Sequence, residues 1–130
     1  MVAYGFNSRF EPLIAAGTKL QTIRAIGNRR HAEPGDRMQI YVGMRTKKCR
    51  KVIADPVCIV SEPITLEIPD SPTKAGFYQI GDPALNMPKF IDAGFAAADG
   101  FASVEEFIEF FIKAHGPGVF KGRLIKWAPR

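Results

Sequence analysis

The sequence has few residues of the kinds that build metal centres or disulfide frameworks. Among its 130 residues are only two cysteines, Cys49 and Cys58, and two histidines, His31 and His115. The cysteines lack Cys-x-x-Cys spacing, and these four scattered residues form no metal-ligand pattern. We therefore expect no metal site and no cofactor, and two reduced cysteines that are buried or idle.

Long apolar runs are also missing. No stretch approaches the roughly 20 apolar residues that a membrane-spanning helix needs, and the N-terminus lacks the basic and then apolar pattern of a signal peptide. The chain has no internal repeat and no low-complexity tract. A length of 130 residues suits one domain with its own core. These features predict a single cytoplasmic domain over residues 1–130, without a membrane partner and taken as a monomer.

Positive charge is concentrated in one part of the chain. The sequence carries 18 Lys and Arg against 13 Asp and Glu, which gives a net charge of +5. Residues 19–51 hold ten of the cations and only Glu33 and Asp36, a balance of +8 there and −3 elsewhere. A positive surface of this kind suits a partner that carries phosphate groups. The alternative is a basic face that contacts only water.

One segment, GTKLQTIR from Gly17, combines an amine, a hydroxyl and a guanidinium near one turn. Gly17 can adopt the positive φ that ends a helix, and the β-branched Thr22 and Ile23 favour a strand after it. Because side chains alternate along a strand, Thr22 and Arg24 share one face and Ile23 points to the other. This face, with Lys19 at its start, is a candidate ligand site. The alternative is an edge strand with solvated polar side chains.

Apolar periodicity and turn residues predict the order of the elements. Strands are predicted at residues 2–6, 19–24, 38–44, 76–80 and 119–127. The stretch 52–68 is predicted to hold two or three short strands, because Pro56 and Pro63 interrupt it. Helices are predicted at residues 8–16 and 103–115, each after a Ser-x-x-Glu capping box, with a helical turn at 87–93. This order predicts an α+β fold, a small mixed β-barrel flanked by two or three helices, and not a doubly wound parallel sheet.

Several short motifs resemble those of the ASCH domain family in the PUA-like superfamily. They are the GTK at Gly17 followed by the TIR at Thr22, the PGD at Pro34, the YVGMRT at Tyr41 and the DGF at Asp99. Together they span most of the chain. The resemblance implies a PUA-like β-barrel with a cleft between barrel and helices, in which the family is thought to bind RNA or nucleoside-like ligands.

The same resemblance implies a reaction. Some members of the family are small amidohydrolases that remove the acyl group from N4-acetylcytidine and related nucleosides with a Lys, a Thr and a Glu. Lys19 and Thr22 match the first two by motif and spacing, and Asp99 stands in place of the Glu, one methylene shorter. Lys19, Thr22 and Asp99 are therefore the candidate catalytic residues. Ribonuclease activity has also been attributed to the family.

Three functions stay open: a basic cleft that binds RNA or a nucleotide, a hydrolase, and a regulatory protein without chemistry. In a binding module, cations hold phosphates and an aromatic ring stacks on a base. Arg24 is a candidate clamp for a phosphate or a carbonyl, with a salt bridge to Asp36 as the alternative. The candidate ligand-binding residues are Arg24, Arg29, Arg30, Tyr41, Arg45, Lys48 and Arg50.

Overall fold

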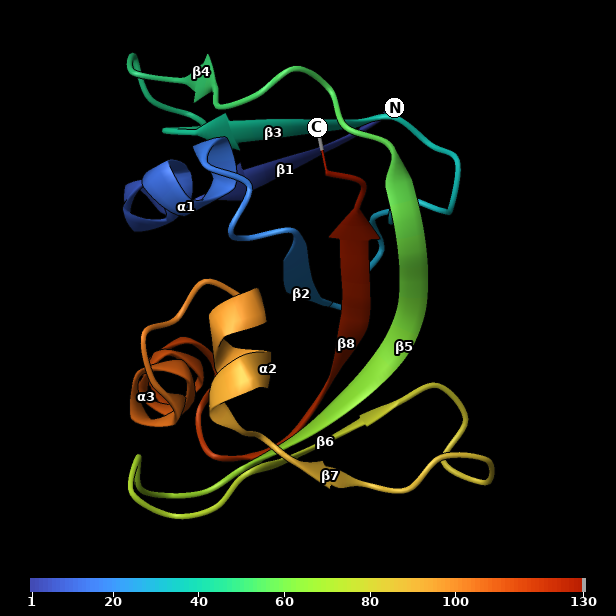
Figure 1. The fold of residues 1–130 in the computed structure, drawn as a ribbon, viewed down its shortest axis with the longest axis vertical. Coiled ribbons are helices and arrows are strands. Elements are labelled where there is room, and N and C mark those ends of the chain that lie inside the picture. Colours follow the sequence, from blue (N-terminus) through green and yellow to red (C-terminus); the bar gives the residue numbers. More distant parts are fainter. Residues whose placement is uncertain (130) are drawn as a thin grey trace.

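The computed structural model describes residues 1–129, which form a mixed α+β fold with two sheets and short helices (Figure 1). The predicted α+β class is confirmed. No helix in the described part of the chain has the length and apolar character of a membrane span. The elements, in chain order, are β1 (Val2–Phe6), the 3-10 helix η1 (Ser8–Phe10), α1 (Glu11–Ala15), β2 (Gln21–Ala25), β3 (Met38–Val42), β4 (Arg50–Lys51), β5 (Cys58–Ile68), β6 (Phe77–Ile80), β7 (Lys89–Phe90), α2 (Ala93–Ala98), α3 (Val104–His115) and β8 (Gly118–Trp127).

The strands form two sheets that are not closed into a barrel. One sheet has the order β1-β3-β4 and the other the order β2-β8-β5-β6-β7. The two sheets meet where the amide of Met38, at the start of β3, donates at 2.8 Å to the carbonyl of Pro56, just before β5. Between β1 and β2 no ladder forms among residues 1–129. A side chain crosses there instead, since Arg24 Nη2 donates to Gly5 O at 2.7 Å. The predicted barrel therefore stays open between β1 and β2.

β5 corrects the prediction of two or three short strands over residues 52–68. It runs for 11 residues and contains Pro63. The carbonyl of Pro63 accepts from the amide of Gly81, just beyond the end of β6. Because the N–H and C=O of one residue point to the same neighbour in an antiparallel ladder, the missing donor also faces the end of β6. Pro63 therefore ends the pairing with β6 without breaking the strand.

The helix boundaries follow the capping residues. α3 begins after Ser103 as predicted, and Ser103 Oγ accepts from the amide of Glu106 at 3.1 Å. α2 begins after Asp92, whose carboxylate accepts from the amide of Phe95 at 2.8 Å. The predicted helical turn at 87–93 is wrong, because β7 pairs with β6 there.

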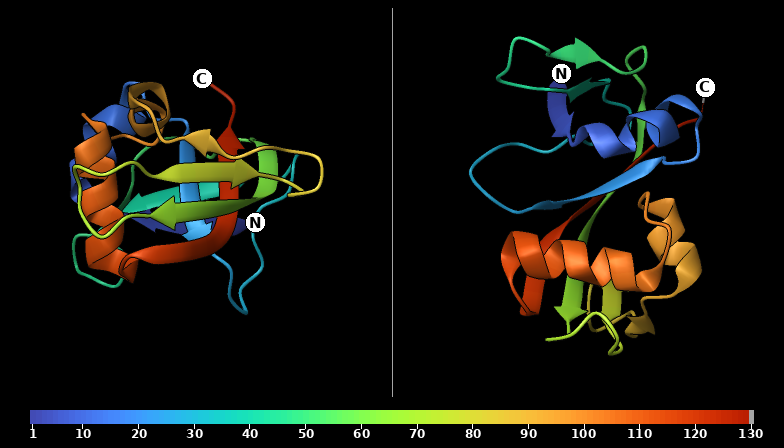
Figure 2. Two further views of the ribbon diagram at one scale, coloured as in Figure 1. Left: turned by 90° about the horizontal axis from the view of Figure 1, so that it is seen from below. Right: turned by 90° about the vertical axis from the view of Figure 1, so that its left-hand side faces the viewer.

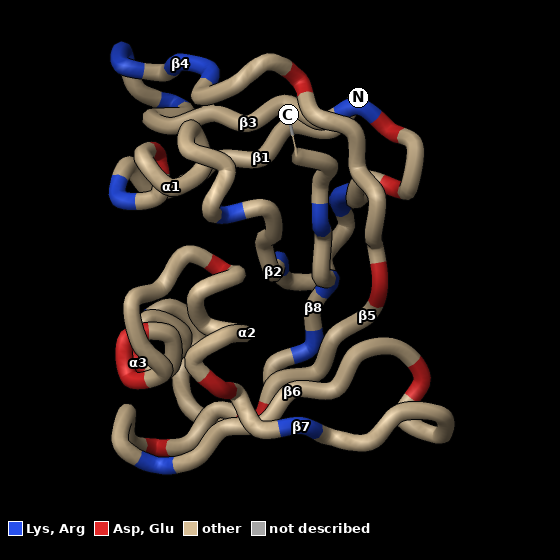
Figure 3. Tube along the Cα trace, in the orientation of Figure 1, with Lys and Arg blue, Asp and Glu red and all other residues tan. Residues whose placement is uncertain are grey.

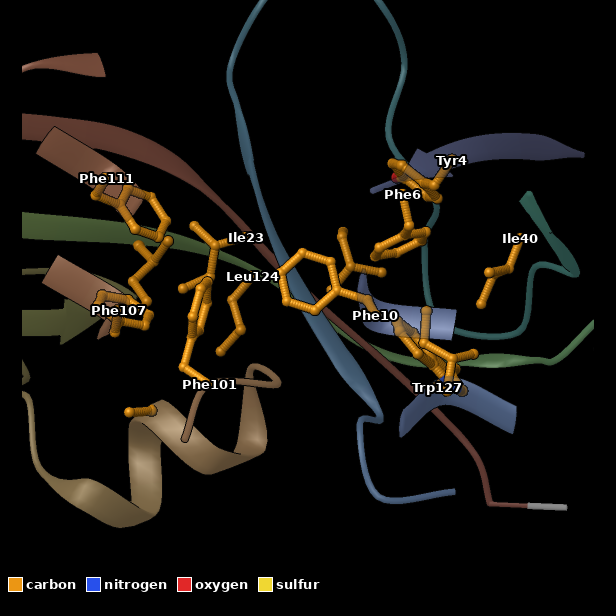
Figure 4. Close-up of a cluster of buried hydrophobic side chains, with 14 of the residues drawn as sticks. Tyr4, Phe6, Phe10, Ile23, Ile40, Phe101, Phe107, Phe111, Leu124 and Trp127 are labelled. Atoms are coloured by element: carbon orange, nitrogen blue, oxygen red, sulfur yellow. The ribbon is translucent and has the colours of Figure 1, made fainter. Parts of the chain in front are cut away.

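Buried apolar side chains fill the space between the sheets and the helices. α1 and α3 lie on opposite sides of β2 (Figures 1 and 2). The polar residues of β2 therefore lie between two helical layers. Figure 4 shows an aromatic group with Phe101, Phe107 and Phe111, a second group with Tyr4, Phe6 and Trp127, and Phe10 between the two.

Candidate functional site

A cavity of about 310 Å³ lies between β1, β2, α3 and the turn after α2. Its polar wall contains the three candidate catalytic residues, Lys19, Thr22 and Asp99, together with Arg24. The structure thus brings together side chains that are up to 80 residues apart in the sequence. Its apolar wall consists of Phe6, Phe10, Ile23, Phe101, Phe110 and Phe111, with Asn7 and His115 also in the lining.

Lys19 is buried two residues before β2, and its ammonium group is surrounded by acceptors. Nζ donates to the carbonyls of Gln21 at 2.7 Å and of Asp99 at 2.6 Å, and it lies 3.5 Å from Asp99 Oδ1. The ring centre of Phe10 is 4.9 Å away. Burial lowers the pKa of Lys19, and the negative charge of Asp99 opposes this shift. Three acceptors for three N–H bonds favour the charged form, so Lys19 supplies a fixed positive charge in the wall.

Asp99 is the C-cap residue of α2 and is 5% exposed. Its Oδ1 accepts from Gln21 Nε2 at 3.5 Å, and its Oδ2 has no hydrogen-bond partner among residues 1–129. Burial raises the pKa of Asp99, while Lys19 opposes this shift. A raised pKa brings the proton exchange of a carboxyl group closer to neutral pH, as general acid–base catalysis requires.

Gly100 allows the turn after α2 to approach Lys19. Its φ is +93°, a conformation that side chains of L-residues disfavour. A Cβ at this position would lie 2.8 Å from Lys19 Cδ and 3.0 Å from Phe10 Cδ1. The contact between Lys19 and Asp99 therefore depends on a glycine next to the carboxylate.

Thr22 and Arg24 are joined by a hydrogen bond on the cavity side of β2. Arg24 Nε donates to Thr22 Oγ1 at 3.0 Å. The guanidinium lies 4.6 Å from the ring centre of Phe6, which fixes its position. No acceptor for the Thr22 hydroxyl hydrogen is found in the described chain, so this hydrogen is free for a ligand. The alternative ion pair between Arg24 and Asp36 is wrong, because Asp36 pairs with Arg30 at 2.8 Å.

The loop between β2 and β3 carries two predicted ligand-binding arginines outside the cavity lining. Arg29 donates to the carbonyl of Ala3, and Arg30 forms its ion pair within the loop. Tyr4 anchors this loop to β1, because its hydroxyl lies 3.0 Å from His31 Nδ1. Arg29 therefore contacts β1, Arg30 stays within the loop, and neither lines the cavity.

The remaining four predicted ligand-binding residues lie on β3, on β4 and in the loop that joins them, also outside the cavity lining. Tyr41 is half-buried on β3, and Arg50 on β4 pairs with Glu11. Arg45 and Lys48 are exposed on the loop and form no ion pair within residues 1–129. Figure 3 shows the basic residues gathered around β4, at the end of the molecule opposite β7.

The aromatic wall of the cavity was not predicted from the sequence. The apolar stripe of α3 is core as predicted, since Phe107 and Ile108 are fully buried. Phe111 belongs to the same stripe but also lines the cavity, beside Phe110. Phe110 lies outside the stripe, and a large apolar residue there is the signal that could have indicated a ligand-facing side of α3.

No three His, Cys, Asp or Glu side chains of the described residues are grouped as ligands of one metal ion. Comparisons of the chain with known protein-family models, with curated proteins and with solved structures find no match. Function is therefore inferred from the geometry and chemistry of the site itself.

Proposed function

We propose that the protein is an amidohydrolase that removes the acyl group from an N4-acylated cytidine bound in this cavity. The observation that carries the proposal is the convergence of Lys19, Thr22, Arg24 and Asp99 on one aromatic-walled cavity. The resemblance to ASCH amidohydrolases supports it, because Lys19 and Thr22 match their motif and Asp99 stands in place of their Glu. The fold is then an open variant of the PUA-like barrel.

The size and walls of the cavity suit a single nucleoside. The volume of the cavity, about 310 Å³, is at the lower end of the range for ligand pockets. The cavity is therefore too small for a nucleic-acid strand. The five phenylalanines of the lining offer faces and edges for a planar base. Apolar walls also exclude water, which strengthens the electrostatic effect of the charged groups on a reacting carbonyl.

The contacts of each polar group support a division of roles. Thr22 attacks the acyl carbonyl, and Asp99 Oδ2 takes its proton and returns it to the departing N4 amine, since a threonine hydroxyl needs a base at neutral pH. Arg24 and Lys19 stabilise the negative charge on the tetrahedral intermediate. Water then hydrolyses the acyl ester of Thr22, which yields a carboxylic acid and cytidine. The three acceptors around Lys19 Nζ argue against a role of Lys19 as the base.

Incubation with N4-acetylcytidine, with cytidine and acetate measured as products, tests the proposal. Thr22→Val removes the hydroxyl at nearly constant volume, and we expect kcat/KM to fall by about 100-fold or more. Thr22→Ser is the matched control and keeps measurable activity. Asp99→Glu restores the longer carboxylate of the related enzymes. If neither the wild-type protein nor Asp99→Glu deacylates any N4-acylated cytidine, the proposed reaction is wrong.

A binding module without chemistry is the second candidate. One observation favours it. Lys19 and Asp99 already interact with each other in the structure, so neither charge needs a substrate as its partner. In that case cytidine binds, Thr22→Val binds it equally well, and no acyl group is released. The ribonuclease alternative gains no support, because His115 lines the cavity whereas His31 bonds to Tyr4 and to Ala25 O.

A further inference from the structure

A second cavity, of about 390 Å³, adjoins the first at the end of β1. The two cavities share Gly5, Phe6 and Asn7 as a common wall. Ser8, Gly43 and Met44 complete the lining of the second cavity. The second cavity therefore lies between this common wall and the loop that joins β3 to β4.

The lining of the second cavity suits an anion. It contains no Asp or Glu, and its polar side chains are those of Asn7 and Ser8. Asn7 Oδ1 accepts from the amide of Arg9 at 3.0 Å, which leaves Asn7 Nδ2 as a donor for a ligand. The Ser8 hydroxyl can donate as well.

The loop of residues 43–48 adds further donors to this side. Gly43 O accepts from the amide of Thr46 at 3.0 Å and from its hydroxyl at 2.6 Å, which closes the loop into a turn. The amides of Met44, Arg45 and Lys47 have no acceptor within residues 1–129. Gly43 and Arg45 have φ values of +68° and +65°. Alternating conformations of this kind turn neighbouring N–H groups toward one side, where they bind anions.

The cations of this loop lack the ion pairs that several other cations of the basic segment form. Arg30, Arg50 and Lys51 each form an ion pair, with Asp36, Glu11 and Asp55 respectively. The side chains of Arg45, Lys47 and Lys48 form none within the part of the chain that the structure describes. Unpaired positive charge and unbonded N–H groups thus lie on the loop whose Gly43 and Met44 line the second cavity.

We infer that the second cavity is a phosphate subsite, so that the substrate is an acylated cytidine nucleotide rather than the free nucleoside. The inference rests on the proposed function, because the base is placed in the first cavity. The residues shared by the two cavities, Gly5, Phe6 and Asn7, separate one cavity from the other. A nucleotide has the same arrangement, because its ribose separates the base from the 5′-phosphate. The phosphate can belong to a free nucleotide or to the 5′ end of an RNA.

A pair of double variants tests the subsite. Arg45→Asn with Lys48→Gln removes two loop charges, and asparagine tolerates the positive φ at position 45. Lys89→Gln with Lys121→Gln removes the same charge from exposed positions on β7 and β8. We expect the wild type to prefer N4-acetylcytidine 5′-monophosphate over N4-acetylcytidine by about tenfold or more in kcat/KM. In the loop variant, kcat/KM for the nucleotide falls to the value for the nucleoside, so the preference is lost, and the control variant keeps it.

Binding gives the same comparison without turnover. Calorimetry with cytidine and with cytidine 5′-monophosphate is expected to show tighter binding of the nucleotide, and only the loop variant removes the difference. A short RNA beginning with cytidine, with and without a 5′-phosphate, distinguishes the two sources of the phosphate. Titration with inorganic phosphate, followed through the amide signals of Met44, Arg45 and Lys47, reports on the subsite alone.

The failures of the two proposals can be separated. Equal affinities for cytidine and its monophosphate, or an equal loss of preference in the control variant, overturn the subsite while deacylation stands. Tight, loop-dependent binding of the monophosphate without any deacylation supports the subsite and rejects the hydrolase.

Discussion

The first cavity and the loop of residues 43–48 use the same kinds of residue in opposite ways. In the cavity, Lys19 is buried, its donors are bonded, and burial lowers its pKa. On the loop, Arg45 and Lys48 are exposed and form no ion pair within residues 1–129. Buried charges act on their immediate neighbours with little screening, whereas exposed charges attract anions over a distance and are screened by salt. The cavity is therefore suited to chemistry and the loop to capture of a charged ligand.

The two regions also differ in what their charges contribute to stability. Burial disfavours the charged forms of both Lys19 and Asp99, so their attraction and their hydrogen bonds only offset the desolvation of the pair. Removal of one partner leaves the other charge buried. Breaking an exposed pair such as Arg50 with Glu11 lowers the free energy of unfolding only a little, because water replaces the missing partner.

The largest expected effect follows from Asp99→Ala. It leaves the Lys19 ammonium in the cavity wall without a carboxylate, and we expect the free energy of unfolding to fall by about 3–5 kcal/mol. Glu11→Ala removes the partner of Arg50 and is expected to cost less than about 1 kcal/mol. Urea unfolding of both variants checks the comparison. Similar losses in the two variants would show that the buried pair has no special role.

Gly100→Ala is expected to lower the free energy of unfolding by less than Asp99→Ala does. The expected loss is nevertheless larger than the cost of a positive φ alone. Gly17 is the matched control, because its φ is +80° and a Cβ there would meet nothing within 4 Å. Both variants carry a backbone cost of about 1–2 kcal/mol. Gly100→Ala adds about 1–3 kcal/mol, since the Cβ displaces Lys19 or Phe10. Thermal or urea unfolding measures the difference, which vanishes if the turn after α2 can shift away from Lys19.

Features set by neighbouring residues could be predicted from the sequence. The alternation along β2 predicts that Thr22 and Arg24 share a face, and the hydrogen bond between them agrees. The capping box at Ser103 predicts the start of α3. Both features depend on the spacing of residues within one element, and this spacing is read directly from the sequence.

Features set by distant partners could not be predicted in the same way. The place of Pro63 inside β5 depends on where β6 ends, and the barrel stays open between β1 and β2, where the Arg24 side chain donates to Gly5 O. The contact of Lys19 with Asp99 joins residues 80 positions apart, and in the sequence only the resemblance to the ASCH family placed the two residues in one candidate site. The phenylalanines of the cavity look like core residues in the sequence, because burial and ligand contact require the same side chains.

The pH dependence of stability distinguishes the two regions, because the buried groups of the cavity have shifted pKa values. Because the folded pKa of Asp99 is raised above its unfolded value, the native state holds this proton more tightly. Its contribution is fully present below the unfolded pKa of about 3.9 and is lost as the pH rises through the folded pKa. We expect the unfolding free energy of the wild type relative to Asp99→Asn to fall as the pH rises from about 4 towards the folded pKa, by at most about 1.4 kcal/mol per pH unit.

Lys19 has the opposite linkage. Its lowered pKa means that the native state binds this proton less tightly than the unfolded state, so stability rises with pH between the folded and the unfolded value. The loop variant Arg45→Asn with Lys48→Gln serves as the reference. Its stability relative to the wild type is expected to stay constant between pH 4 and pH 6. A slope in the loop variant that matches the slope in Asp99→Asn would assign the effect to overall charge.

The smallest expected effect is a gain in stability, in contrast to the losses expected for Asp99→Ala and Gly100→Ala. Arg45 is the one residue other than glycine with a positive φ in residues 1–129, at +65°, and this conformation costs an L-residue about 1–2 kcal/mol. Arg45→Gly removes that cost but adds chain entropy to the unfolded state, so we expect a net gain of up to about 1 kcal/mol in the free energy of unfolding. Lys47→Gly, on the same loop and without a positive φ, is expected to lose about 0.5–1 kcal/mol.

Strain that persists at an exposed arginine is typical of functional sites, and Arg45→Gly should therefore gain stability while it loses the preference for cytidine 5′-monophosphate. If Arg45→Gly destabilises as Lys47→Gly does, the arginine contributes to the fold, and the contrast between loop and cavity is weaker than the charges suggest.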